Sequence, residues 1–546
     1  MTHYDVLFIH PPAIYDFRKI VHFPGPASQV SIHTTHQYIQ VPIGILSVAE
    51  FLDRHGYKVL IDNLGERMLA DPYFDVKEYI KRNVADVYAI ELHWYLHTQG
   101  AIEVAKICKE LHPESLVIIG GLTASVFHEE LIKHFDFIDA VIRGESEKPL
   151  LEFMNMYENR GHISETPNVT YREDGRITVA PIMNPSANLD EFEFTRLDLL
   201  EPKGSVFTPG TSPHISMFVC RGCTYNCVTC GGSAYSYKTY FGMERPSFRS
   251  PNKLVEDLQR LTAQGVKCIG ILQDPRMGGR KYWTQLLSAL RKEKFDVERL
   301  TMDLFYPADE EYVKELSRIG VTMALNISPE SGSYEVRKKH GRNYTNEALL
   351  ATVKKCHRYH MPITVYFLLP LAPDTKESVK ETWRLWGALC ELDREALDKG
   401  LLKDVEERVP VGGPIMGHMV FLDPGSLGYD YPEKYGYRVL FKNIKDCIQS
   451  LSMPHWVQRI NYETDSLDRD AITGFIYESM EVVISQREKY RLFDPHEIYI
   501  QRLLLNVDKT IAGEVKHIMG LKDEILKKLK LRELKSKYEE FFSNII

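Results

Sequence analysis

Three closely spaced cysteines are the residues of this sequence best suited to chemistry. Cys223, Cys227 and Cys230 are separated by three and then two residues, and two glycines follow the last of them. Thiolates this close on one loop can share a metal centre, and soft sulfur ligands favour zinc, Cu(I) or an iron–sulfur cluster. A structural zinc site takes four ligands, usually from two separated pairs, whereas three cysteines leave one iron of a cluster open to another ligand. The pattern therefore favours an iron–sulfur cluster.

A fourth cysteine leaves a second interpretation open. Cys220 and Cys223 form a pair spaced for metal binding, so a zinc site made by Cys220, Cys223, Cys227 and Cys230 is the alternative. Zinc-binding pairs normally lie farther apart than these two pairs do. Residues 215–219 alternate like a β-strand, which predicts that Cys220 ends this strand as a buried thiol or as one beside the cluster.

The region around the cysteines is organised as repeated strands and helices. Strands are predicted at 215–219, 268–272, 300–304, 322–327 and 363–369, and helices at 250–263, 281–292, 309–319 and 346–360. This alternation predicts an incomplete parallel βα barrel over residues 211–410, with its active site at the carboxyl ends of the strands. Polar residues at these ends include Gln273, Asp274, Asp303 and Glu330. Helix capping is an equally weighted role for Asp274 and Asp303.

The first 160 residues alternate in the same way. Strands are predicted at 6–9, 58–62, 87–90, 116–119 and 138–142, with helical segments such as 44–55 and 101–111 between them. The fold class is therefore α/β, with a doubly wound parallel sheet whose ligand lies beyond the carboxyl ends of the strands. The loops there contain Gly120-Gly121 and Gly144-Glu145, where glycine lets the backbone approach a ligand closely. No GxGxxG motif follows the first strand, which argues against a dinucleotide site.

The remaining segments have less regular patterns. Residues 161–210 contain a predicted hairpin at 169–179 and an extended linker. Residues 411–546 form a predicted α-rich C-terminal domain whose first loops are dense in tyrosine, aspartate, proline and glycine. Such loops suit a cap over a substrate, although surface structure is the alternative. Within them, Tyr429, Tyr431 and Tyr435 are the candidate substrate contacts.

Length and composition restrict the class of protein. The chain has 546 residues, of which 44% are hydrophobic and 26% charged, as in ordinary globular proteins with several domains. Its net charge of −8 is spread over mixed charges, so we expect no nucleic-acid partner. No apolar run approaches the length of a membrane span and no signal peptide is evident, so we expect a cytoplasmic protein without a membrane partner. Its nine cysteines do not form a disulfide framework, which suits a reducing compartment.

The cysteine loop resembles the signature of the radical S-adenosylmethionine (SAM) superfamily. In that superfamily three cysteines hold a 4Fe–4S cluster and the open iron binds SAM, which implies these roles for Cys223, Cys227 and Cys230. The segment 326–333 resembles the "GIESGS" turn of the superfamily, with Asn326 in place of the usual glycine. The SAM contacts that we expect are Tyr225, Gln273, Asp303, Ser328 and Glu330.

Residues 1–160 resemble the cobalamin-binding domain that precedes some radical SAM domains. The similar segments are His10-Pro-Pro12, Val41-Pro-Ile-Gly44, Gly120-Gly121 and 144–150. The DxHxxG motif that supplies a cobalt ligand in mutase-type domains is absent, which implies base-off cobalamin. Its lower face would be free or would meet a residue of the loop 91–99, where His93 or His97 could ligate cobalt. The expected cobalamin contacts are Pro12, Pro42, Trp94, Tyr95, His97, Gly120, Gly121, Thr123, Gly144 and Glu145.

The succession of the two domains resembles the class B radical SAM methyltransferases. This resemblance implies that a 5′-deoxyadenosyl radical takes hydrogen from an unactivated sp3 carbon and that methylcobalamin then delivers a methyl group. It also implies an electron donor such as ferredoxin or flavodoxin. The segments Asp423-Pro-Gly-Ser426 and Tyr435-Gly-Tyr437 are similar to an archaeal branch that methylates a glutamine of methyl-coenzyme M reductase, which implies a peptide or protein substrate.

Other activities remain open at the level of sequence. They are methylation of a small-molecule natural product, a cobalamin-dependent radical reaction without methylation such as ring contraction, and a cobalamin-dependent sensor with a vestigial cluster site. A peptide substrate predicts an open groove lined by the tyrosine-rich loops, whereas a small molecule predicts a closed pocket.

Overall fold

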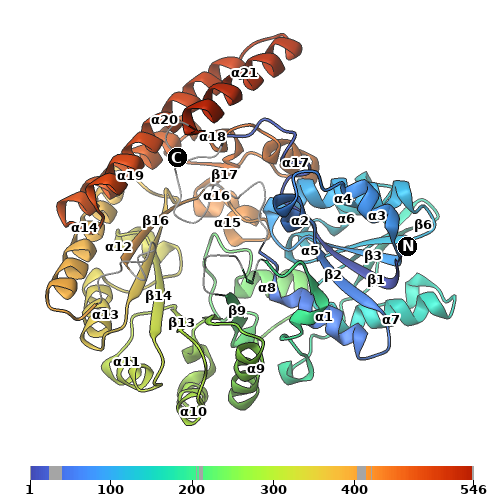
Figure 1. Cartoon of the computed structure of the whole chain (residues 1–546), viewed down its shortest axis with the longest axis horizontal. Helices are drawn as coiled ribbons and strands as arrows, with labels where there is room; N and C mark the ends of the chain where they lie inside the picture. The colour runs from blue at the N-terminus through green and yellow to red at the C-terminus, as the bar shows by residue number, and fades with distance from the viewer. Residues whose placement is uncertain are drawn as a thin grey trace.

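A computed structural model describes residues 2–23, 40–204, 206–207, 213–402, 413–419 and 421–543. Two α/β units lie side by side, and long helices of the C-terminal region run along one side of the molecule (Figure 1). The predicted limits of the barrel, residues 211 and 410, lie outside the described residues.

The first unit contains the predicted doubly wound sheet. Its five central strands are parallel and have the spatial order β5-β4-β3-β1-β2. The order reverses between β1 and β3, and ligands of such sheets bind at this switch point. The strands are β1 (Thr2–His10), β2 (Val59–Asn63), β3 (Asn83–Glu91), β4 (Leu116–Gly120) and β5 (Ala140–Ile142).

Helices cover both faces of this sheet because successive side chains of each strand point to opposite faces. One core contains Phe8, Ala89 and Ile118 and packs against α1 (Ile43–Asp53) and α7 (Glu147–Glu158). The other contains Ile9, Ile90 and Ile119. The helices on that second face are α2 (Leu64–Ala70), α3 (Val76–Arg82), α4 (Thr98–Leu111), α5 (Leu122–Val126) and α6 (His128–His134).

The segment predicted as a linker adds strands to both edges of the first sheet. The hairpin β6 (Val169–Glu173) and β7 (Arg176–Val179) pairs antiparallel with β5. At the other edge, β8 (Leu200–Glu201) pairs in parallel with β2. The segment is therefore an integral part of the first unit as well as a connection to the second.

The second unit is the predicted partial barrel. Its six described strands are parallel, in the order β16-β15-β14-β13-β12-β9. They are β9 (His214–Phe218), β12 (Cys268–Leu272), β13 (Arg299–Leu304), β14 (Met323–Glu330), β15 (Ile363–Leu369) and β16 (Gly413–His418). The sequence did not predict β16, which lies beyond residue 410, because its two glycines and one proline obscure any strand pattern.

Helices cover the outer face of this second sheet. They are α9 (Pro251–Ala263), α10 (Gly279–Lys292), α11 (Glu310–Ser317), α13 (Asn346–Arg358) and α14 (Lys376–Asp398). The short strands β10 (Cys220–Arg221) and β11 (Ser247–Phe248) and the helices α8 (Ala234–Phe241) and α12 (Tyr334–Lys339) lie in the connections between strands.

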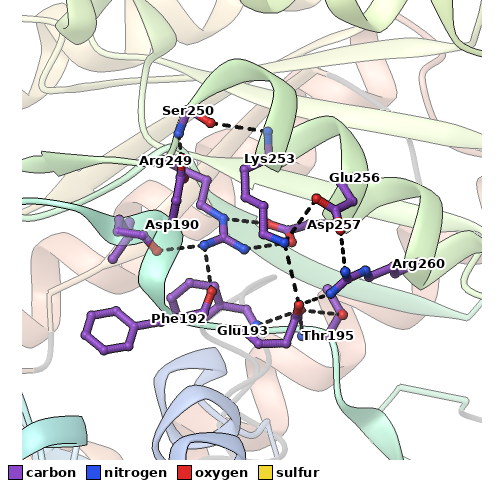
Figure 2. Close-up of polar contacts among 12 residues, drawn as sticks. Asp190, Phe192, Glu193, Thr195, Arg249, Ser250, Lys253, Glu256, Asp257 and Arg260 are labelled. Atoms are coloured by element: carbon purple, nitrogen blue, oxygen red, sulfur yellow. Dashed lines mark hydrogen bonds and ion pairs between the residues drawn. The ribbon is translucent and has the colours of Figure 1, made fainter.

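A buried ion pair fastens the linker to the barrel (Figure 2). Arg249 forms two 2.7 Å bonds with the carboxylate of Asp257 in α9. Its other terminal nitrogen donates to the carbonyls of Leu189 (2.6 Å) and Phe192 (2.7 Å) in the linker. Both charged side chains are fully buried. A charge buried in this way is stable only with its partners, so these contacts fix the linker on the second unit.

The C-terminal region begins with short elements that lie between the two units (Figure 1). These are α15 (Leu427–Asp430), α16 (Pro432–Tyr435), β17 (Tyr437–Val439), α17 (Ile444–Leu451), α18 (Trp456–Arg459) and β18 (Tyr462–Thr464). Leu422, Tyr437 and Trp456 share a core with Val228 of the cysteine loop. The long helices α19 (Arg469–Lys489), α20 (Pro495–Met519) and α21 (Glu524–Ser543) follow. None of the helices in the described part of the chain has both the length and the apolar character needed to cross a bilayer.

Candidate functional site

The three cysteines lie on the loop between β10 and α8. Cys227 is buried, whereas Cys230 is exposed to solvent. The backbone N–H of Tyr225 donates to Cys223 Sγ (3.4 Å), and that of Gly232 donates to Cys230 Sγ (3.3 Å). Backbone N–H groups that point at sulfur stabilise its negative charge, as iron–sulfur ligation requires.

A cationic side chain from a distant segment supports the same loop. Burial raises the pKa of the Cys227 thiol to about 11, and the guanidinium of Arg342 opposes this increase. Arg342 is itself buried and donates to the Glu330 carboxylate at the end of β14 (3.1 Å). Arg342 was not predicted as a site residue, because nothing in the cysteine motif indicates which arginine the fold will bring to it.

Cys220 is set apart from the other three cysteines. It is fully buried in β10, its Sγ donates to the carbonyl of Gly222 (3.6 Å), and burial raises its pKa. A single tetrahedral zinc ion holds its sulfur ligands about 3.8 Å apart. Among the described residues, no three of these cysteine sulfurs lie within 4.8 Å of one another. The buried thiol predicted at position 220 is confirmed, and the arrangement does not match a zinc site.

Polar residues at the barrel mouth form a connected group. Asp303 accepts a hydrogen bond from the backbone N–H of Gln273 (3.1 Å) and one from the Asn326 amide (3.1 Å). The Gln273 side-chain oxygen faces the backbone N–H of Cys220 (3.5 Å). Asp303 therefore joins neighbouring strands instead of capping a helix. Asp274 does cap the following turn and forms an ion pair with Arg276 (2.6 Å), which is a structural role.

The other predicted SAM contacts lie at the same end of the barrel. Glu330 ends β14 with φ of +66° and forms an ion pair with Arg342. Ser328 is half-buried on the same strand. The ring of Tyr225 lies 5.4 Å from that of Phe305, just beyond β13. Tyr225 belongs to the cysteine loop itself, whereas Ser328 and Glu330 lie at the carboxyl end of β14.

The first unit contains a pocket with about 1000 Å³ of empty space, including its open mouth. Its inner wall is apolar and includes Phe8, Ile45, Ala89, Ile118 and Ile142, which come from α1 and four strands of the sheet. Five predicted cobalamin contacts, all at the carboxyl ends of the strands or the start of α1, line it: Pro42, Gly120, Gly121, Gly144 and Glu145.

Glycine at position 121 is required by the fold. Its φ is +122°, and a Cβ atom there would lie 2.5 Å from the carbonyl oxygen of Leu92. The turn can therefore approach the neighbouring loop only with glycine. The pocket is wide and combines an apolar inner wall with charged side chains such as Glu145 and Arg221, which fits a large cofactor that carries both apolar and polar groups.

Four predicted cobalamin contacts lie in the protein interior instead. Tyr95 packs against Phe421, and the His97 ring lies 4.7 Å from that of His10. The Thr123 hydroxyl donates to the carbonyl of His93, and Pro12 is buried against α4. None of Pro12, Tyr95, His97 and Thr123 lines the first pocket, and a contact of any of them with cobalamin stays a prediction. The loop 93–97 turns directly into α4, so its later side chains point into the core.

Two other residues of this loop remain accessible. Trp94 lines a second pocket, between the two units, together with Leu272 at the end of β12. His93 lines the first pocket, and burial lowers the pKa of its imidazole. Glu91 accepts hydrogen bonds from the His93 backbone N–H and from His10 Nδ1. Burial acts to raise the pKa of Glu91, but the contacts with His10 hold it at about 2, so Glu91 stays ionised.

The first tyrosine-rich loop of the C-terminal region packs on the cysteine loop. Asp423 accepts a hydrogen bond from the Gly231 N–H (3.2 Å), and the Gly428 N–H donates to the carbonyl of Val228 (2.8 Å). Burial raises the pKa of Asp423 to about 6. Asp423 was not among the site residues predicted from the sequence.

The predicted substrate tyrosines have different environments. The Tyr429 hydroxyl donates to the carbonyls of Phe441 (3.0 Å) and Lys442 (3.2 Å), which fixes the side chain within its own loop, and its contact with a substrate stays a prediction. Tyr431 is 50% exposed, and its ring lies 5.8 Å from that of Tyr235 in α8. Tyr435 is half-buried at the end of α16.

Two family models match successive parts of the chain. The model described as "B12 binding domain" matches residues 31–154, and the model described as "Radical SAM superfamily" matches residues 217–385. These ranges correspond to the sheet unit and to most of the barrel. The chain belongs to the cobalamin-dependent radical SAM methyltransferase family.

Known proteins are similar to large parts of this chain. "Uncharacterized methyltransferase PH0819" of Pyrococcus horikoshii is 24% identical over 380 residues, 69% of this chain and 76% of that protein. "Hopanoid C-3 methylase" of Methylococcus capsulatus is 28% identical over 226 residues, 41% of each. The cobalamin-dependent SAM radical enzyme OxsB, solved with aqua-cobalamin and SAM, has a TM-score of 0.58 at 13% identity, covering 100% of this chain and 75% of that one.

Membership of this family defines the cofactors of the enzyme. It uses a 4Fe–4S cluster, SAM and cobalamin. The three thiols of one loop, two of them supported by backbone N–H groups, fit the cluster. The apolar pocket below the glycine-rich loops fits cobalamin.

Proposed function

We propose that the enzyme methylates an unactivated sp3 carbon after hydrogen abstraction. The observation that supports this most directly is the wall shared by the two cofactor regions. Arg221, just before the cysteine loop, and Tyr237 and Phe241 of α8, just after it, line the pocket of the sheet unit. A radical reaction followed by methyl delivery requires both groups to face one cavity, because only positioning makes such a radical selective.

The proposed assignments follow from where the residues lie. Cys223, Cys227 and Cys230 hold the cluster, and Gln273, Asp303, Ser328, Glu330 and Tyr225 surround SAM. When bound, the cluster and SAM supply a 5′-deoxyadenosyl radical on receipt of one electron, and methylcobalamin supplies the methyl group that a second SAM replaces. A one-electron donor of the ferredoxin or flavodoxin kind would reduce the cluster.

For cobalamin we propose base-off binding. Gly120, Gly121, Gly144, Glu145 and Pro42 surround the cofactor, and the neutral imidazole of His93 meets its lower face. The position of His93 in the pocket wall and its lowered pKa support this assignment, because a neutral imidazole is the form that binds metals.

For the substrate we propose a glutamine of methyl-coenzyme M reductase. The sequence similarity of the segments 423–426 and 435–437 supports this choice. The loop 421–437 packs beside the cysteine loop, where a substrate cap would be placed. A small apolar substrate is the second candidate. Leu272, Trp94, Ile43 and Leu46 line the pocket between the units, and Leu272 is 41% exposed there.

The test is anaerobic reconstitution with iron, sulfide and methylcobalamin, followed by reduction and incubation with SAM and candidate substrates. Peptides that contain the glutamine and a panel of small apolar molecules would be compared. The proposal predicts 5′-deoxyadenosine and a mass gain of one methylene unit on a substrate. If SAM is cleaved without any methyl gain across the panel, non-methylating radical chemistry is favoured instead.

A further inference from the structure

Arg221 connects the cysteine loop with the sheet unit. It lies in β10, two residues before Cys223. Its Nη1 lies 2.5 Å from Glu145 Oε1 and its Nη2 lies 2.6 Å from Glu147 Oε1. Both glutamates follow Gly144: Glu145 lies in the loop between β5 and α7, and Glu147 is the first residue of α7. One guanidinium therefore holds two carboxylates of one unit against the first residues of the other unit's metal loop.

This contact is buried, and both of its carboxylates accept further hydrogen bonds. Arg221 has 15% of its side chain exposed, whereas Glu145 and Glu147 have 8% and 1%. The Ser47 hydroxyl of α1 donates to Glu147 (2.5 Å), and the Ser186 N–H of the linker donates to Glu145 (2.7 Å). Four segments thus meet at one guanidinium, and a planar bidentate donor fixes both distance and orientation there.

Aromatic rings hold the guanidinium from another side. Its central carbon lies 5.3 Å from the ring centre of Phe192 and 6.0 Å from that of Phe194. Both phenylalanines are buried in the linker. The Arg221 side chain consequently has little freedom to change conformation. It therefore fixes the position of the sheet unit relative to the barrel.

The contact also lies between the two cofactor regions. Arg221, Glu145 and Glu147 all line the pocket of the sheet unit. On the other side, only Gly222 separates Arg221 from Cys223. We propose that Arg221 is a positioning residue that sets the separation and orientation of cobalamin relative to the cluster. This inference rests on the proposed function, in which both cofactors occupy these sites.

The physical consequence follows from the geometry that methyl delivery needs. Misplacement of reacting groups by about 1 Å can lower the rate by about a hundredfold. Removal of the guanidinium would leave two carboxylates buried beside each other, and their repulsion would move the loop 144–147 away from β10. SAM cleavage, which needs only the barrel, would continue.

The test measures the distance between the two cofactors directly. Reduced cluster and cob(II)alamin each carry an unpaired electron, so pulsed electron–electron dipolar spectroscopy gives their distance distribution. Wild-type protein, Arg221→Met, Arg221→Lys and the control Arg260→Met would be loaded with both cofactors. Arg260 is a suitable control because it is a half-exposed arginine of the outer helix α9 whose partners, Glu193 of the linker and Glu256 of α9, do not line the pocket.

We expect one narrow distribution for the wild type and for Arg260→Met. Arg221→Met should give a broader distribution with a longer mean, and Arg221→Lys an intermediate one, because lysine cannot bridge both carboxylates. With an active substrate, the ratio of 5′-deoxyadenosine to methylated product should rise about tenfold or more in Arg221→Met. Equal distributions and equal ratios in all four proteins would overturn the proposal.

Cofactor content separates this failure from failure of the proposed function. Iron, sulfide and cobalamin are determined in each sample before the distance is measured. A wild-type protein that does not take up both cofactors contradicts the proposed function. If Arg221→Met does not retain both, the distance measured in Arg221→Lys decides the inference.

Discussion

At the scale of single residues, the four cysteines of the metal loop differ in environment. Cys223 and Cys230 accept backbone N–H bonds, whereas Cys220 is buried and donates to Gly222. We predict that alanine at 223, 227 or 230 abolishes cluster binding and turnover. Cys220→Ala should keep a cluster that cleaves SAM. Iron and sulfide analysis with electron paramagnetic resonance of the reduced proteins checks this, and the ligand assignment is wrong if Cys220→Ala behaves like the other three.

The lower face of cobalamin gives a second prediction at this scale. His93 lines the pocket, whereas His97 is buried in the core. The cob(II)alamin spectrum should show nitrogen splitting into triplets that become doublets when the protein is labelled with 15N. His93→Ala should lose this splitting and His97→Gln should keep it. An unlabelled wild-type spectrum without such splitting would contradict the assignment of His93.

Site residues that belong to a short sequence motif could be predicted from the sequence. Site residues that reach the site only through the tertiary fold could not. The cysteines and the glycines at 120, 121 and 144 were found because a short motif requires each of them. Arg342 and Asp423 were missed because the tertiary fold alone brings them to the loop. The burial of Tyr95 and His97 could not be predicted, because nothing in the loop composition shows that a helical turn begins there and directs both side chains inward.

At the scale of elements, the turn after β14 depends on one close helix contact. A Cβ atom on Gly332 would lie 2.3 Å from the Cα atom of Thr382 in α14. The Gly332 N–H also donates to the Thr382 hydroxyl (2.8 Å). We predict that Gly332→Ala lowers the free energy of unfolding by about 3 kcal/mol or more, since backbone must move to relieve the overlap. SAM cleavage should fall with it, because Glu330 lies two residues away.

A matched control comes from another glycine of the chain. Gly474 lies within α19, and nothing is within 4 Å of a Cβ atom there. Gly474→Ala should leave stability unchanged or raise it by up to about 1 kcal/mol. Urea unfolding under anaerobic conditions measures both variants. Similar stability in the two would show that the contact between the turn and α14 is not tight.

At the scale of the whole molecule, Arg249 holds the linker on the barrel. Its removal would leave Asp257 buried without a partner and would free the carbonyls of the linker. We predict that Arg249→Met costs about 3–5 kcal/mol in the free energy of unfolding. Arg260→Met, which removes a half-exposed cation of α9 that pairs with Glu193 and Glu256, should cost less than about 1 kcal/mol. Equal losses of unfolding free energy for the two variants in urea titrations would show that Arg249 does not hold the linker on the barrel.

The order of the two units could be predicted because each has a strong strand and helix periodicity. Their docking could not be predicted. It depends on the linker strand β8, on Arg221 and on Arg249, none of which stands out from its neighbours in the sequence. The hairpin of β6 and β7 was predicted, but its pairing with β5 was not. The strand β16 was missed for a related reason, since its pairing with β15 outweighs a weak local preference.

The central claim is that one enzyme uses both cofactors on one substrate. The most direct test is turnover with SAM that carries a trideuterated methyl group, using the reconstituted and reduced protein. The account predicts that the product gains a methyl group with three deuterium atoms after the first turnover and that 5′-deoxyadenosine forms in proportion to it. Full loading of the cluster and of cobalamin with intact SAM would contradict the account and would favour a sensor whose cluster site is vestigial.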